Sequence, residues 1–496
     1  MDTVCALDLG TGSVRACLVS TDGLIVARRG VRIRARAAEG VAAGLEYEPG
    51  ELRDAIAAAI SAARTDAPAG MRIAAMTAAA MRPSCALLDA AGAALYLGPN
   101  RDARGVGEAV ELLRRDRDLI HAVTGQLPPI LSWSARLRWF AANQPEVLAA
   151  ASVATSIEGW MLSLFGVEPA MDFSSASANG LFDIAAGGWS DQMLSLVSFP
   201  SDRLARVLAA GTVLGPAHGE FARELGLEGV PVCAGAGDTH AALAGSGAWR
   251  EGETAIIAGT SMPVARVVAN PGPRSARLWS SRHLRPGFGV VESNTGESGF
   301  VWEWLAETLG VEVFELDDLA RAAQPTAVIA HLGTVPQDFA DMPLLHSGGF
   351  VFGLPPGMFG AGRAGLARAG IEAAAWAAAE ALSWVDAETV GIGPVRVCGG
   401  MTQSELWLET LAAALGRPIL VVAEDSAAIG VAACAAEGSG LVADAGSVLD
   451  AAARRGREVH PDDALVAAMS AGLPRWQEIV ANLGRGAMRI SALLGS

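Results

Sequence analysis

The sequence predicts an α/β protein with two similar domains. Apolar runs with a strand-like period alternate along the chain with amphipathic helix patterns, which is typical of α/β architecture. The length of 496 residues favours two or more domains. One strand–turn–strand pattern also occurs twice, about half a chain apart. We therefore expect two sheets, each of which begins with a β-hairpin.

The repeated pattern consists of an apolar strand, a Gly-Thr turn and a second apolar strand. Its first copy is Ala6–Ser20 (ALDLGTGSVRACLVS) and its second is Ala255–Ala269 (AIIAGTSMPVARVVA). The Gly-Thr pairs at 10–11 and 259–260 are offset by 249 residues (259 − 10). Such a match also arises by chance in a chain rich in Ala and Gly, so the pattern alone leaves duplication open.

The other elements follow from local patterns. Pro49 precedes a helical period and suits the first turn of a helix. We expect strands at 4–9, 14–20, 24–29, 72–77 and 230–235, and helices at 51–64, 108–117, 134–143 and 157–165. The last segment, 443–496, has helical patterning and is expected to form a terminal helical extension. The expected domains are 1–244, 245–442 and 443–496.

Charge and composition exclude some partners. A net charge of −16 and a pI near 5.0 argue against a nucleic-acid-binding protein, which usually has a basic face. Phosphate ligands stay open, because backbone N–H groups hold phosphates without a basic patch. The hydrophobic share of 51% is sufficient for a large core.

The expected compartment is the cytoplasm. The six cysteines have no CxxC spacing and no metal-ligand spacing, which favours buried thiols in a reducing compartment. The first residues lack the basic region of a signal peptide. The longest uncharged run, Met342–Gly362, is interrupted by prolines and glycines and cannot form a membrane helix. We therefore expect no membrane association.

The first Gly-Thr turn, DLGTGS, carries groups that suit a phosphate. Gly10 and Gly12 permit close backbone approach, and the hydroxyls of Thr11 and Ser13 add donors. The turn is neither a Walker loop nor a GxGxxG before a helix. An ordinary tight hairpin can have the same residues, so the turn alone does not distinguish a phosphate-binding loop from a structural hairpin.

Asp8 favours the phosphate interpretation. A carboxylate inside a buried strand is costly unless it is paired or near a cation. An Mg²⁺ ion that keeps several waters suits one carboxylate together with phosphate oxygens. The second turn has Ile257 at the matching position. We therefore expect only the first turn to face a metal ion.

Two further segments are candidates for chemistry. In VCAGAGDTHAAL, Asp238 follows an apolar strand and glycines, so it is either a helix N-cap or a general base beside a substrate hydroxyl. His240 has no metal-ligand partner at useful spacing and is expected to be structural. Gly399 and Gly400 follow another strand and either admit a flat ligand such as a purine or serve strand–helix packing.

Together these segments resemble the FGGY carbohydrate kinases, a branch of the superfamily of actin, sugar kinases and heat-shock chaperones. ALDLGTGSVRACLVSTDG resembles the first phosphate motif, IIAGTS the second, VCAGAGDTHAA the catalytic-aspartate segment and GGMTQSELWLETLAAALGRPI the adenosine motif. WSARLRWFAANQPEV is similar to a family signature, with Arg136 where lysine is usual. GLARAGIEAAAW resembles the helix that follows the Gly-Leu pair at 353–354. The likeness spans nearly the whole chain.

The resemblance implies two ribonuclease-H-like domains around a central cleft. It also implies ATP-dependent phosphoryl transfer, with Asp8 holding Mg²⁺ through water and Asp238 acting as the catalytic base that also faces the metal. The implied phosphate- and adenosine-binding residues are Gly10, Thr11, Gly12, Ser13, Arg15, Gly259, Thr260, Gly399, Gly400 and Ser404. Positioning and charge neutralisation are what such a transfer needs most.

The implied substrate residues are Met81, Arg82, Asp102 and Asp238. Xylulokinases usually show a Met-His pair and a Trp-Asn-Asp triplet at two of these places. The segments here, AAAMRPS and PNRDAR, lack both and look closer to the autoinducer-2 kinases. The expected acceptor is a small sugar or polyol, first a ketopentose, with the autoinducer-2 precursor or a tetritol as alternatives. A homodimer is left open.

Two other classes compete with a sugar kinase. A chaperone-like or cytoskeletal ATPase of the same fold would, as a chaperone, need a separate peptide-binding domain, for which the chain has no spare length. A kinase relic that binds a metabolite without turnover would not need Asp8 and Asp238, both of which are present. We therefore expect an active kinase.

Overall fold

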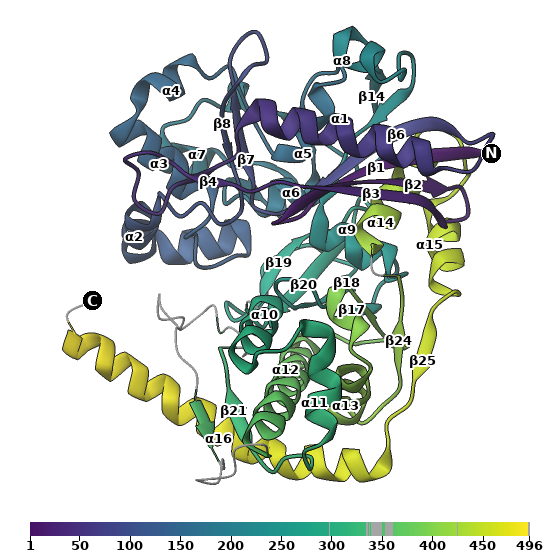
Figure 1. Cartoon of the computed structure of the whole chain (residues 1–496). Coiled ribbons are helices and arrows are strands. Elements are labelled where there is room, and N and C mark those ends of the chain that lie inside the picture. The colour runs from purple at the N-terminus through teal and green to yellow at the C-terminus, as the bar shows by residue number, and fades with distance from the viewer. Residues whose placement is uncertain are drawn as a thin grey trace. The chain divides into compact units, whose positions relative to one another are not determined.

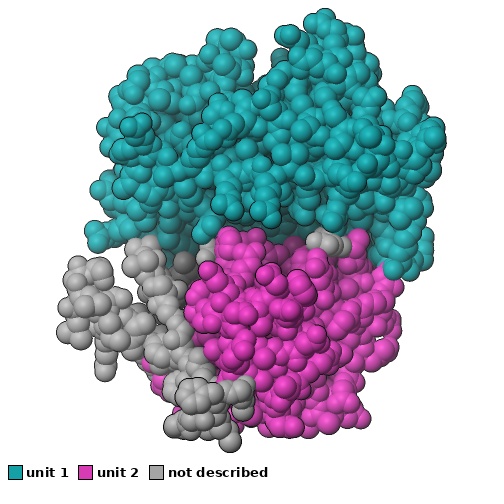
Figure 2. Space-filling model, viewed as in Figure 1, with its two compact units in different colours: residues 1–251, 267–291, 425–455 teal, residues 252–266, 292–424, 456–496 magenta. Residues whose placement is uncertain are grey.

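The computed structural model describes residues 1–296, 298–333, 336, 338, 350–352, 361–423 and 425–494. The described residues form two compact units, which Figure 2 shows in different colours. Unit 1 contains 1–251, 267–291 and 425–455, and unit 2 contains 252–266, 292–424 and 456–496. The domain boundaries expected after residues 244 and 442 stay a prediction. The Gly-Leu pair at 353–354 and most of the run 342–362 lie outside the described residues.

The sheet of unit 1 has the order β14-β15-β6-β1-β2-β3, and β16 also pairs with β6. Strands β1 and β2 form the antiparallel hairpin around the first Gly-Thr turn, while β1 and β6 are parallel. Strands β15 and β6 are parallel as well, and β14 runs antiparallel to β15. Its strands are β1 (Asp2–Leu9), β2 (Ser13–Ser20), β3 (Ile25–Arg32), β6 (Arg72–Ala80), β14 (Val213–Pro216), β15 (Pro231–Cys233) and β16 (Ala236–Gly237).

Unit 2 repeats this arrangement of strands. Its sheet contains the order β18-β17-β23-β24-β25. Strand β17 pairs antiparallel with β18 and parallel with β23, β24 is parallel to β23, and β25 is antiparallel to β24. These strands are β17 (Thr254–Ile257), β18 (Pro263–Val268), β23 (Val395–Cys398), β24 (Ile419–Val421) and β25 (Arg457–Val459). The same directions in the same order confirm the duplication that the sequence left open, and with it the α/β class.

Two more strands, β19 (Trp279–Arg282) and β20 (Gly289–Asn294), precede β18 in the order of that sheet, β19-β20-β18. The other strands have two to five residues and are β4 (Arg36–Ala37), β5 (Leu45–Glu46), β7 (Cys85–Leu88), β8 (Ala94–Gly98), β9 (Val153–Thr155), β10 (Ala170–Asp172), β11 (Phe182–Asp183), β12 (Gly188–Trp189), β13 (Arg206–Leu208), β21 (Ile329–His331) and β22 (Phe350–Phe352).

The helices connect and cover the strands (Figure 1). In chain order they are α1 (Pro49–Asp66), α2 (Val106–Thr124), α3 (Trp133–Asn143), α4 (Pro145–Ala150), α5 (Ile157–Ser163), α6 (Phe173–Ser177), α7 (Asp191–Val197), α8 (Gly219–Glu224), α9 (Asp238–Gly245), α10 (Ser298–Leu309), α11 (Leu316–Arg321), α12 (Ala361–Glu388), α13 (Glu405–Leu415), α14 (Ser426–Gly438), α15 (Ala445–Ala453) and α16 (Asp463–Leu494). None of the helices among the described residues is both long and apolar enough to cross a bilayer.

The sheet of unit 1 is buried on both faces. Successive side chains of a strand point to opposite faces, and β1 shows this directly. Leu7 and Leu9 belong to one core cluster, which includes the apolar face of α1. Val4 and Ala6 belong to another, which includes small residues of α14 and α15. Figure 1 shows α1 on one side of the sheet and α14 on the other.

The predicted elements agree with the structure in kind and differ at their ends. Helix α2 extends from Val106 to Thr124, beyond the expected 108–117. The segment after residue 442 is not wholly helical, because it contains β25, which pairs with β24. All six cysteines are buried thiols without disulfides, as expected.

Candidate active site

Asp8 is the last residue but one of β1, and it is paired with the neighbouring strand β2. Its carboxylate is 3% exposed and accepts a hydrogen bond of 2.7 Å from the guanidinium of Arg15, its direct partner on β2. The same guanidinium lies 3.3 Å from a carboxylate oxygen of Asp425, just before α14. Arg28 of β3 contacts the other oxygen of Asp425 at 2.5 Å. Two acidic and two basic side chains thus alternate at this edge of unit 1.

The surroundings of Asp8 act on its pKa in both directions. Burial raises its pKa above the ordinary value, and the charge of Asp425 raises it further. The guanidinium of Arg15 opposes both effects. Within the described residues, no group of three acidic, histidine or cysteine side chains could enclose a metal ion. One buried carboxylate beside the open turn is a donor set that suits an ion whose other ligands are phosphate oxygens and water.

Asp238 is the first residue of α9 and lies at the same sheet edge as Asp8. Strand β6 runs between the two segments: Ala79 of β6 is paired with Asp8 on one side and with Ala236 on the other. The carboxyl ends of parallel strands meet at one edge of a sheet, which brings residues that follow them together. Asp8 and Asp238 are far apart in the sequence, and the sheet places them near each other.

The environment of Asp238 raises its pKa to about 6. Burial is the main cause, and the nearby negative charge of Asp8 adds to it. The positive charge of Arg82 acts in the opposite direction. The N–H and hydroxyl of Thr239 donate to Oδ1 of Asp238, at 2.6 and 3.2 Å. A carboxylate with this pKa can accept a proton near neutral pH.

Met81 and Arg82 follow directly after β6. The N–H of Met81 donates to the carbonyl of Leu9, which keeps the chain at the sheet edge. A Cβ on Gly237 would lie 3.1 Å from Cδ of Arg82, so the arginine stem passes close to the backbone before Asp238. The structure therefore brings Arg82, Asp8 and Asp238 together, and their roles stay a prediction.

Asp102 has a different environment. Its side chain is fully buried, and its carboxylate accepts hydrogen bonds from the Tyr96 hydroxyl, from Nε of Arg104 at 2.8 Å and from the Leu45 N–H at 3.0 Å. Arg136 donates to the Asp102 carbonyl at 3.1 Å. A substrate hydroxyl would have to compete with these protein donors. The substrate role of Asp102 stays a prediction.

The first Gly-Thr turn is open around its glycines. The Gly10 N–H donates to the Ser13 carbonyl at 3.0 Å, which closes the turn between β1 and β2. A Cβ on Gly12 would have no atom within 4 Å. Space for a ligand therefore exists beside this backbone, and Thr11 and Ser13 are both partly exposed.

In unit 2, the second Gly-Thr turn and the Gly-Gly pair lie side by side. Strands β17 and β23 are parallel neighbours, and the Met401 N–H donates to the Ala258 carbonyl at 3.1 Å. Gly399 has φ of 100°, and a Cβ there would lie 2.5 Å from that same carbonyl oxygen. Only glycine fits this position. Thr260 follows Gly259 in the turn beside it.

Ser404 already has structural partners. Its Oγ accepts a hydrogen bond from the Trp407 N–H at 3.0 Å and thereby caps α13. The same hydroxyl donates to the carboxylate of Asp317 at 2.5 Å. The adenosine role of Ser404 stays a prediction.

Two residues of this neighbourhood were not among the predicted site residues. Asp425 lies before a helix of small residues in EDSAAIGVAACAA, a pattern that reads as a helix start rather than as a partner for Arg15. Thr239 is an ordinary first-turn residue in the sequence, and only the structure shows that both of its donors face Asp238.

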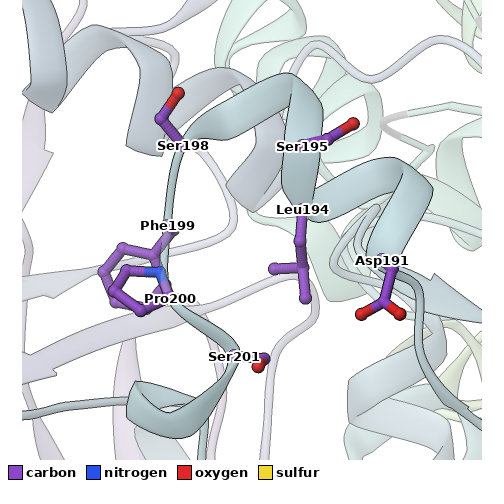
Figure 3. Close-up of a pocket in the computed structure, with 7 residues that line it drawn as sticks. All are labelled: Asp191, Leu194, Ser195, Ser198, Phe199, Pro200 and Ser201. Atoms are coloured by element: carbon purple, nitrogen blue, oxygen red, sulfur yellow. The ribbon is translucent and has the colours of Figure 1, made fainter.

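The surface of unit 1 also has a shallow hollow around the end of α7, which Figure 3 shows. None of its lining residues is among the predicted site residues. They are Asp191, Leu194, Ser195, Ser198, Phe199, Pro200 and Ser201. We assign it no role in the chemistry.

Known proteins resemble the chain over nearly its whole length. It is 29% identical to the autoinducer-2 kinase of Yersinia enterocolitica serotype O:8, over 96% of this chain and 94% of that protein. The crystal structure of xylulose kinase from Rhodospirillum rubrum has a TM-score of 0.83 and 25% identity, and the match covers 97% of this chain and 99% of that one. Ligand-bound xylulose kinase from Lactobacillus acidophilus has a TM-score of 0.86 at 18% identity, with 98% and 99% covered, and shows the fold alone.

Family models account for both halves of the chain. The N-terminal domain of the FGGY family of carbohydrate kinases matches residues 3–245, and its C-terminal domain matches residues 254–438. These matches agree with the two duplicated sheets. The chain belongs to the FGGY family of carbohydrate kinases, ATP-dependent phosphotransferases that act on sugar hydroxyl groups.

Proposed function

We propose that this kinase transfers the γ-phosphoryl group of ATP to a hydroxyl of a small keto sugar, with Asp238 as the general base. The observation that supports this role most is the position of Asp238 at the sheet edge it shares with Asp8, together with its pKa of about 6. Oδ1 is held by Thr239. Oδ2 is then the oxygen that would accept the hydroxyl proton as the phosphoryl group is transferred.

Asp8 is proposed as the residue that faces the Mg²⁺ of Mg·ATP. When bound, the ion would neutralise charge on the phosphate oxygens. Asp8 would hold its water ligands, and Arg15, which touches Asp8, would lie beside the terminal phosphates. Gly10, Thr11, Gly12 and Ser13 would contribute the turn around them. The residues of unit 2 that are proposed to bind the phosphates and adenosine are Gly259, Thr260, Gly399, Gly400 and Ser404.

The proposed acceptor belongs to the class used by the relatives. The autoinducer-2 kinase likeness covers 96% of the chain, and the Met81-Arg82 and Asp102 segments look closer to such kinases than to xylulokinases. The autoinducer-2 precursor is therefore the first candidate. A ketopentose is the second, because a xylulose kinase superposes at a TM-score of 0.83 with 25% identity. Arg82, beside Asp238, is proposed to donate hydrogen bonds to vicinal hydroxyls of either acceptor.

ADP release from Mg·ATP tests this proposal. The acceptors are the autoinducer-2 precursor, xylulose, ribulose, a tetritol and glycerol, each compared with ATP alone. We expect the highest kcat/KM with one of the first two. If no acceptor stimulates ADP release above the ATP-only rate, the proposed substrate class is wrong. If only glycerol or the tetritol is used, the acceptor is a polyol and the proposed keto sugar is wrong.

A further inference from the structure

We propose that Ser174 and Asp172 are positioning residues for Asp238, because they fix the backbone immediately before it. The inference rests on the proposed role of Asp238 as the base. Ser174 and Asp172 lie in a different part of the chain, at the junction of β10 and α6, and they are completely buried. Their connection to Asp238 is a chain of hydrogen bonds.

The first link joins Ser174 to the segment before the base. The N–H of Gly237 donates to Oγ of Ser174 at 3.0 Å. Gly237 is the residue directly before Asp238 and the N-cap of α9, and it has no side chain with which to cap the helix. The hydroxyl of Ser174 therefore holds the backbone at the point where the strand ends and the helix with the base begins.

The second link fixes the direction of that hydroxyl. Oγ of Ser174 donates to Oδ1 of Asp172 at 2.9 Å. Oδ2 of Asp172 accepts from the Ser174 N–H, and Oδ1 also accepts from the Ser175 N–H, each at 2.9 Å. The only proton of the Ser174 hydroxyl is thus committed to Asp172. The Ser174 oxygen is then free to accept the hydrogen bond from the Gly237 N–H. Asp172 thus fixes the orientation in which Ser174 accepts that bond.

The backbone around Gly237 has few other contacts that could hold it in place if its hydrogen bond to Ser174 were lost. Strand β16 consists only of Ala236 and Gly237, so it contributes a short ladder to β6. A Cβ on Gly237 would lie 3.1 Å from Cδ of Arg82 and 3.4 Å from Oγ of Ser174. The same backbone position therefore adjoins both Arg82 and the Ser174 hydroxyl. A shift of this backbone would move Asp238 relative to Arg82.

The alternative is that Asp172 and Ser174 only stabilise the N-terminus of helix α6. Asp172 is indeed the N-cap of that helix, and Asp is a favoured N-cap residue. That role needs the backbone N–H groups of Ser174 and Ser175 and makes no use of the Ser174 hydroxyl. Removal of the hydroxyl alone therefore separates capping from positioning.

The test variant is Ser174→Ala, and Ser175→Ala is its matched control. Both remove one buried hydroxyl from adjacent residues of α6, but only Ser174 accepts the Gly237 N–H. We expect Ser174→Ala to lower kcat about tenfold, with the KM for ATP unchanged and the pH profile of kcat unshifted, since Asp238 itself is intact. Ser175→Ala should retain wild-type kcat. Equal losses in the two variants, or wild-type kcat in a folded Ser174→Ala, would overturn the proposal.

Amide hydrogen exchange gives a readout that does not depend on the substrate. In the unmodified chain, we expect the Gly237 N–H to exchange far more slowly than an exposed amide, and Ser174→Ala to accelerate it about tenfold. Ser175→Ala should leave it slow. Rapid exchange of the Gly237 N–H in the unmodified chain would contradict its hydrogen bond to Ser174. This outcome is informative even if a variant fails to fold. Slow exchange without kinase activity towards any acceptor would instead count against the proposed function.

Discussion

Asp8 and Arg15 face each other across the first hairpin, and their side chains are joined by a hydrogen bond of 2.7 Å. This contact places a guanidinium and a carboxylate beside the open Gly-Thr turn. Asp425, at the start of α14, touches Arg15 from another direction. The position of Arg15 is therefore set by two carboxylates that come from opposite ends of the chain.

Asp425→Asn should weaken ATP binding. The substitution removes a charge that contacts both Arg15 and Arg28, so Arg15 loses one of its two carboxylate contacts. We expect the KM for ATP to rise by about 3- to 10-fold, which is about 0.7–1.4 kcal/mol and within the net contribution of one ordinary hydrogen bond, with a smaller change in the KM for the sugar. Steady-state kinetics measure both. Asp450→Asn, which breaks an exposed pair with Arg250, is the control, and equal effects in the two variants would contradict the assignment.

Asp8→Asn should change the Mg²⁺ dependence of the reaction. The amide keeps the shape of the side chain and loses the charge that would face the hydrated ion. We expect the Mg²⁺ concentration for half-maximal rate to rise by about tenfold or more, which corresponds to the loss of one charged interaction. Rates at saturating ATP over a series of Mg²⁺ concentrations give this value. An unchanged Mg²⁺ dependence would remove Asp8 from the metal role.

Asp238→Asn should abolish most turnover while the chain stays folded. General bases contribute roughly 10²- to 10⁴-fold to rates, and the amide cannot accept the hydroxyl proton. Sugar-dependent ADP release measures the loss. Asp191→Asn is a matched control, since Asp191 is also the first residue of a helix, α7. Comparable activity in the two variants would rule out Asp238 as the base.

The pH profile should follow Asp238. A base with a pKa of about 6 is protonated at lower pH, so we expect kcat/KM to fall about tenfold per pH unit below 6 and to level off above it. Measurement of kcat/KM between about pH 4.5 and pH 8, on both sides of that pKa, tests the expected profile. A limb centred near pH 4 would mean that burial does not raise the pKa of the base.

The same pKa also predicts a stability effect. The folded chain holds the Asp238 proton more tightly than the unfolded chain does, so this residue stabilises the fold at low pH, and the contribution is lost as the pH rises through about 6. Asp238→Asn should therefore raise Tm more at pH 8 than at pH 4. Thermal unfolding at both pH values checks the sign.

Gly245→Ala should destabilise unit 1. A Cβ on Gly245 of α9 would lie 1.8 Å from the Ser426 carbonyl oxygen, at the start of α14. Figure 1 shows these helices side by side. Because backbone must move, we expect a loss of about 3 kcal/mol or more in the free energy of unfolding, at the upper end for overpacking. Denaturant unfolding measures it, and Gly188→Ala, where a Cβ meets nothing within 4 Å, should be nearly neutral.

Local patterns predicted the two hairpins and several of the longer helices, because apolar alternation and turn residues act over a few positions. Strand β25 escaped prediction since only one of its three residues is buried. Contacts between distant segments were beyond local patterns. Arg28 and Asp425 are 397 residues apart, and nothing near either one indicates the other. One partner of Asp102 shows the same limit, since the Leu45 N–H that donates to its carboxylate is 57 residues away in the sequence.

The placement of 425–455 in unit 1 has a consequence for biosynthesis. Helices α14 and α15 cover one face of the first sheet and share a core cluster with Val4 and Ala6 of β1. Ala241, Ala244 and Trp249 share that cluster, but the part that α14 and α15 contribute is missing until almost all of the protein has been made. A fragment that ends at residue 251 should therefore be insoluble. Nascent chains of this enzyme would depend on chaperones until the last helices emerge.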